Sequence, residues 1–149
     1  MFVGYRNVLI ASWTAQGTGP LIAALGRALD AFAEQHPEGF SNLHIIAAGL
    51  PLADSEARAA LGALMKTHDK ALATVGTVLD GTGFWASATR SLIMSLQLLT
   101  PSTFAMRTCG SDPELAAWML KPHAQRTGVT LDQPALEKAM ASARAMAVA

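Results

Sequence analysis

The segment from residue 73 to residue 99 constrains the fold more than any other part of the chain. Residues 73–79 form an apolar, β-branched run of strand length, and a glycine-rich turn, Asp80-Gly81-Thr82-Gly83, follows it. Residues 84–99 then have helical spacing, and Thr100-Pro101 predicts the end of that helix because proline cannot continue it. The stripe of this helix consists of Trp85, Thr89, Leu92, Leu96 and Leu99. A strand, a turn and a helix in this order form the unit of an α/β sheet.

The same alternation extends along the chain. We predict strands over residues 5–14, 43–48, 73–79 and 103–108, with residues 2–3 as a short hairpin partner of the first. Helices are expected after Pro20, from Asp54 or Ser55, over 84–99 and after Ser111, where Lys121-Pro122 predicts the end. Residues 123–130 are interpreted as a polar linker before a helix that starts near Asp132.

These elements predict a single α/β domain over residues 1–149. Its core, about residues 5–120, holds a mainly parallel sheet of about four to five strands with crossover helices, and a C-terminal helix over about 132–148 is added to it. Polar residues after the carboxyl ends of such strands are the usual functional positions.

Composition narrows the classes of function. Hydrophobic residues make up 51% of the chain, charged residues 15%, and the formal net charge is +0, which argues against disorder and against nucleic acid as a partner. No apolar segment is long enough for a transmembrane helix, because residues 84–99 would span only about 24 Å. The single cysteine, Cys109, excludes an intrachain disulfide, and we expect a cytoplasmic protein.

No motif of an enzyme stands out. The Asp80–Gly83 turn precedes a helix, where phosphate often binds, but it lacks the lysine and hydroxyl of a phosphate loop. We interpret it as a tight turn with Asp80 helping to cap the helix, and Gly17-Thr18-Gly19 as a second plain turn. The four histidines lack the spacing of a zinc site, so neither a metal nor a cofactor is expected. We interpret His44 as a half-buried structural residue, the other three as helix-end residues, and Cys109 as an inert thiol.

The helix predicted over 84–99 has an unusual outer face. It carries small, flexible or apolar residues around one arginine and lacks the Lys and Glu of a solvated face. The members of this outer face are Ser87, Arg90, Ser91, Met94 and Leu98. Two interpretations stay open: the face contacts a protein partner or a second copy in a homodimer, or the final helix of the same chain covers it.

Residues 42–64 carry a resemblance to a known family. In this stretch an apolar strand is followed by a short loop, by Asp54-Ser55-Glu56 and by a helix of small residues that includes Arg58. The pattern resembles the STAS-like domains, the anti-sigma-factor antagonist and SpoIIAA-like family. The resemblance implies a regulatory protein-binding module in which a hydroxyl at the third position of this motif is phosphorylated. Here that position is Glu56, which is either a permanent negative charge or an ordinary residue of the first helical turn.

Three hypotheses of function therefore follow, the third of which is a carrier of a lipid or a small apolar ligand. The first is a non-catalytic, STAS-like regulatory or sensory module that contacts its partner through Asp54–Arg58 and the outer face of the helix predicted over 84–99. The second is a small-ligand-binding protein or an enzyme that uses the loops after the strands. It predicts a pocket where at least two polar groups among Gly17–Gly19, Ser55, Asp80–Gly83 and Cys109 point inward.

Overall fold

The computed structural model describes residues 1–99 and 101–149, with all side chains in these ranges except those of Leu96 and Leu99. Five strands form one sheet in the order in which they occur in the chain: β1 (Phe2–Tyr5), β2 (Val8–Trp13), β3 (Phe40–Ile46), β4 (Leu72–Leu79) and β5 (Ala105–Cys109). β1 is antiparallel to β2, and the other neighbours are parallel. The predicted class, an α/β fold with a mainly parallel sheet and an added C-terminal helix, is confirmed.

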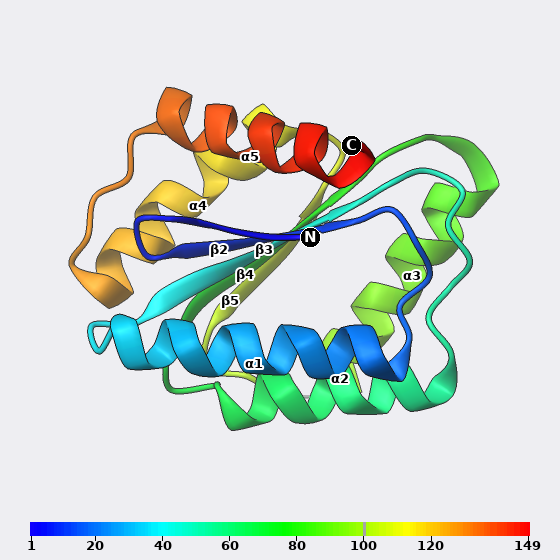
Figure 1. Ribbon diagram of the computed structural model, residues 1–149, viewed down its shortest axis with the longest axis horizontal. Coiled ribbons are helices and arrows are strands. Elements are labelled where there is room, and N and C mark those ends of the chain that lie inside the picture. The colour runs from blue at the N-terminus through cyan, green and yellow to red at the C-terminus, as the bar shows by residue number, and fades with distance from the viewer. Residues whose placement is uncertain (100) are drawn as a thin grey trace.

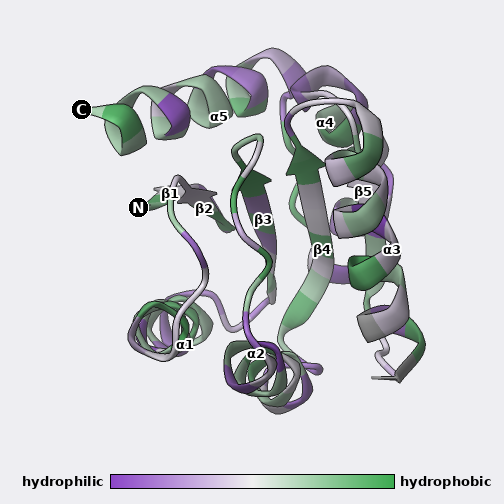
Figure 2. Ribbon diagram, turned by 90° about the vertical axis from the view of Figure 1, so that its right-hand side faces the viewer, coloured by the Kyte–Doolittle hydropathy of each residue, from purple (hydrophilic) through white to green (hydrophobic). Residues whose placement is uncertain are grey.

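The helices are divided between the two faces of the sheet (Figure 1). The crossover helices α1 (Gly19–Gln35) and α2 (Ser55–Thr67) cover one face, and α3 (Gly83–Leu99) stands beside α2 at the side of the β5 edge strand (Figures 1 and 2). The opposite face is covered by α4 (Asp112–Thr127) and α5 (Gln133–Val148). Crossovers between parallel strands are right-handed. Because β2, β3, β4 and β5 follow one another across the sheet in chain order, the three crossover helices α1, α2 and α3 lie on the same face.

Each face of the sheet has its own hydrophobic core. Alternate residues of a strand point to opposite faces, so Ile10 and Leu43 pack against α4 and α5, while Leu9 and Phe40 pack against α1 and α2. The periodicity of α5 is correctly predicted, since Leu136, Met140 and Ala143 are buried.

Three predicted boundaries are wrong. The first main strand, predicted over residues 5–14, begins only at Val8, because Tyr5 belongs to β1 and a turn lies between them. β3 begins at Phe40 and not at Leu43. The prediction placed its start too late because Ser41 and Asn42 are polar, although both are buried in the strand. α4 does not end before Pro122 but continues through it to Thr127, where Gly128 has the left-handed backbone (φ +74°) that ends the helix. Proline removes one hydrogen bond from a helix interior. The buried Met119 and His123 on either side of it hold the helix in place, so residues 123–127 are not a linker.

Candidate ligand-binding site

A cavity of about 190 Å³ lies on the face of the sheet that carries the crossover helices. Its floor is formed by side chains of β2, β3, β4 and β5, including Trp13, His44, Thr77 and Met106. Its walls come from α1, from the loop of residues 50–53, and from α2 and α3, including Leu61 and Leu92. The cavity therefore occupies the space between α3 and the sheet, next to the core that α1 and α2 form with the sheet.

A short hydrogen-bonded chain of side chains lies in the floor. The indole Nε1 of Trp13 donates to Nδ1 of His44 at 3.0 Å, and the two rings are stacked with their centroids 6.0 Å apart. The other ring nitrogen, Nε2, lies 2.8 Å from Nδ2 of Asn42. Because an indole only donates, a neutral His44 carries its proton on Nε2. Turning the Asn42 carboxamide about its axis brings its otherwise unpartnered Oδ1 to Nε2 as the acceptor of this proton. Both nitrogens of His44 are thus occupied.

His44 is neutral at physiological pH. Burial lowers its pKa to about 4, because the charged imidazolium would lose its hydration. Our prediction that His44 is half-buried therefore understates its burial, since only 7% of the residue is exposed. The floor presents an aromatic, uncharged surface to the cavity.

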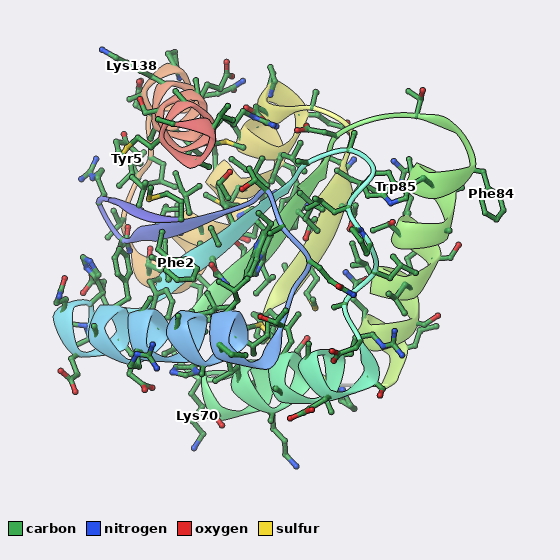
Figure 3. All side chains as sticks on the ribbon, turned by 45° about the vertical axis from the view of Figure 1, so that its right-hand side comes forward. Phe2, Tyr5, Lys70, Phe84, Trp85 and Lys138 are labelled. Atoms are coloured by element: carbon green, nitrogen blue, oxygen red, sulfur yellow. The ribbon has the colours of Figure 1, made fainter. Side chains whose placement is uncertain are left out.

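Trp85 of α3 closes one side of the cavity. Its indole Nε1 donates to the backbone carbonyl of Leu50 at 2.8 Å, which ties α3 to the loop after β3. Figure 3 shows Trp85 directed toward the body of the molecule and its neighbour Phe84 directed away from it. The stripe expected from sequence thus faces the cavity at Trp85, Thr89 and Leu92. Leu96 and Leu99, the other two members, fall outside the described side chains.

Two polar side chains of the wall have unused hydrogen-bonding capacity. Among the described residues of the wall, only Arg58 of α2 carries a charge, and its Nη1 donates to the Ala53 carbonyl at 2.9 Å. It belongs to none of the ion pairs found among the described residues. Thr89 of α3 is 6% exposed, and its hydroxyl is buried without a hydrogen-bond partner in the described part of the chain. Buried polar groups normally have partners, so these two groups could serve a ligand.

The predicted loop residues do not converge on this cavity. Of Gly17–Gly19, Ser55, Asp80–Gly83 and Cys109, only Gly17 contributes to its wall. Ser55 is exposed at the start of α2, and Cys109 is buried in the core on the opposite face. Burial raises the pKa of the Cys109 thiol, which keeps it protonated.

The Asp80–Gly83 turn has a structural role. Gly81 (φ +93°) and Gly83 (φ +81°) have backbone conformations that favour glycine, which explains the repeated glycine of the motif. The Asp80 carboxylate does not face the cavity but forms an ion pair with Arg144 of α5, which also binds Asp112 of α4 with two nitrogens. Thr82 is exposed. Asp80 thus joins elements on the other side of the sheet.

The residues singled out as contacts lie on the surface. Asp54 caps α2 by accepting from the backbone nitrogen of Ala57 at 2.7 Å, and Glu56 is exposed in the first turn. Ser87, Arg90, Ser91, Met94 and Leu98 are all exposed, together with Phe84. α5 lies on the opposite face of the sheet, so the final helix does not cover the α3 outer face (Figure 1).

Sequence reasoning missed a second polar cluster at the other end of the sheet. The Thr74 hydroxyl donates to Ser41, Ser41 pairs with Nδ1 of His123 at 2.7 Å, and Nε2 of His123 pairs with Asn7 at 3.0 Å. His123 and Ser41 are fully buried, and each side chain of this cluster has a hydrogen-bond partner. Burial lowers the pKa of His123 to about 4. A serine and a histidine this close could suggest a hydrolase, but no substrate reaches a fully buried hydroxyl, and the cluster is structural.

Among the described residues, no group of three or more His, Cys, Asp and Glu side chains is placed to hold a metal ion. Within the same ranges, no helix is long and apolar enough to cross a membrane.

Comparison of the chain with protein-family models and with curated protein sequences found no match.

Proposed function

We propose that this protein binds a small, largely apolar molecule in the cavity beneath α3 and acts as a sensory or carrier domain. The observation that carries the proposal is the cavity itself, which has an almost entirely apolar wall. Protein interiors are normally close-packed, and an engineered apolar cavity of about 150 Å³ takes up benzene. Binding is favoured over catalysis because both nitrogens of His44, the nearest candidate for a general base, are already occupied.

The experiment is thermal unfolding of the full chain with and without toluene. A ligand that binds only the folded state raises the unfolding temperature. We expect this rise in the wild type and its loss in Leu92→Trp, because the larger ring would fill the cavity. Leu98→Trp is the matched control, since it makes the same change on the same helix at a residue that is 84% exposed. Equal behaviour of the two variants would show that toluene binds elsewhere.

Native mass spectrometry of the purified protein is the complementary measurement. It reports any molecule retained from the cell, together with the number of subunits. A retained apolar molecule that is absent from Leu92→Trp but present in Leu98→Trp would place it in the cavity.

A second candidate function is supported by the α3 outer face. Three large apolar side chains are exposed among those described in α3: Phe84 by 90%, Leu98 by 84% and Met94 by 55%. Exposed apolar side chains of this size on a helix without acidic residues are typical of a contact surface. We propose that a regulatory, STAS-like module would use this surface for self-association in the cytoplasm, with Asp54–Arg58 as a further contact. Both functions involve α3, so an occupied cavity could alter the surface presented by this helix.

A further inference from the structure

We propose that the molecule bound beneath α3 is an aromatic monocarboxylate whose carboxylate pairs with Arg58. This inference rests on the proposed function and specifies the chemical class of its ligand. It follows from the single charge of the wall, from the aromatic residues around the cavity and from the size of the cavity.

The charge of the cavity favours an anion. Arg58 is half-buried in an apolar wall and uses one nitrogen on the Ala53 carbonyl, and none of the described carboxylates pairs with it. A guanidinium carries five donors and forms its strongest bonds with two oxygens of a carboxylate. The carboxylates nearest in sequence, Asp54 and Glu56, are exposed and outside the wall, and the Asp54 carboxylate caps α2. The buried, neutral His44 adds no charge, so one anionic group matches the site.

The remaining wall favours an aromatic body. Trp13, His44, Trp85 and Phe104 contribute rings to the wall, and the rest of it is mainly aliphatic. The cavity volume of about 190 Å³ exceeds by a small margin the cavity of about 150 Å³ that holds benzene, which leaves space for one ring with a short acidic substituent. The unpartnered hydroxyl of Thr89 offers one further hydrogen bond to a polar group on such a molecule.

The test is isothermal titration calorimetry of the full chain with phenylacetate and with phenylacetamide. The two probes have nearly the same shape and differ in charge. We expect phenylacetate to bind wild-type protein at least about tenfold more tightly, since hydrogen bonds to charged groups are about twice as strong as neutral ones. Arg58→Met should remove this preference and leave phenylacetamide binding within about threefold. Arg90→Met, an exposed arginine on α3 outside the wall, should leave both affinities unchanged.

The outcomes separate the two proposals. Equal affinity of wild-type protein for the acid and the amide would overturn the carboxylate inference while the apolar site stands. If neither probe binds and toluene does not raise the unfolding temperature, both proposals fail. The comparison of the two probes on the wild type needs no variant, so the test holds even if Arg58→Met does not fold.

Discussion

Two histidines, His44 and His123, are buried in different cores, and each has a partner on both ring nitrogens. In each case burial lowers the pKa from 6.5 to about 4. The unfolded chain therefore binds more protons than the folded chain between these values, so the stabilising effect is complete above pH 6.5 and is lost as the pH falls toward 4.

We accordingly expect the free energy of unfolding to decrease by about 1 kcal/mol for each of these histidines between pH 7.5 and pH 5.5. Urea unfolding at a series of pH values measures this change. In His44→Gln and in His123→Asn, the free energy of unfolding should decrease over the same interval by about 1 kcal/mol less than in the wild type, because each variant lacks one of the two histidines. A wild-type stability that does not change between pH 7.5 and pH 5.5 would contradict the assignment of both residues as neutral in the fold.

Single residues were also the hardest features to predict from sequence. His123 lies beside Pro122 in a polar segment, so its pattern indicated a linker, and only the packing of α4 on the sheet reveals that it is buried. Arg58 was singled out as a partner contact, but its place in a cavity wall depends on how α2 and α3 approach each other. The spacing of residues within one helix does not contain that information.

At the scale of elements, the fit of α4 against the sheet depends on Gly76 in the middle of β4. A Cβ atom at this position would lie 2.8 Å from Cδ1 of Leu115 and 2.9 Å from Cδ2 of Leu43. Both leucines are fully buried, so neither side chain can move without disturbing the core. The absence of a side chain at Gly76 lets α4 lie close to the strand.

Gly76→Ala is expected to lower the free energy of unfolding by about 1–3 kcal/mol, the usual cost of inserting a methyl group into a packed core. Gly110→Ala is the control, because nothing lies within 4 Å of its added Cβ and its φ is not positive. It should change stability by less than about 0.5 kcal/mol. Chemical denaturation of both variants measures the difference, and similar values for the two would show that the close approach of α4 has no energetic weight.

Element order and type could be predicted well, because most helices have an apolar stripe at helical spacing and the inner strands are short apolar runs between turn residues. The boundaries of β3 and α4 could not, because tertiary contacts override a local signal there. Ser41 continues β3 by pairing with Val8 of β2, and its side chain is satisfied by His123. The buried face of α4 holds the helix in place through Pro122. The prediction that Asp80 helps to cap the helix after it is not confirmed among the described residues, because the Asp80 carboxylate pairs with Arg144, a residue distant in sequence.

At the scale of the whole molecule, the exposed apolar residues of α3 are the feature most relevant to assembly. We expect the wild type to sediment in analytical ultracentrifugation at twice the 15.6 kDa mass of the chain. Leu98→Lys should weaken association more than tenfold, because it places a charge in the proposed contact. Val148→Lys, at a residue that is 81% exposed on α5, should leave association unchanged. A wild type that stays monomeric at about 100 μM would refute self-association through this face.

The position of α5 also has a consequence for synthesis on the ribosome. Each strand pairs with the one made just before it, so the growing chain can extend its sheet step by step. On the face that carries α4 and α5, however, β1 and β2 are covered by α5, which is made after all five strands. Until Leu136, Met140 and Ala143 emerge, Val8 and Ile10 lack their packing partners from this helix. The nascent chain therefore carries an uncovered apolar surface through most of its translation, which is the kind of surface that chaperones bind.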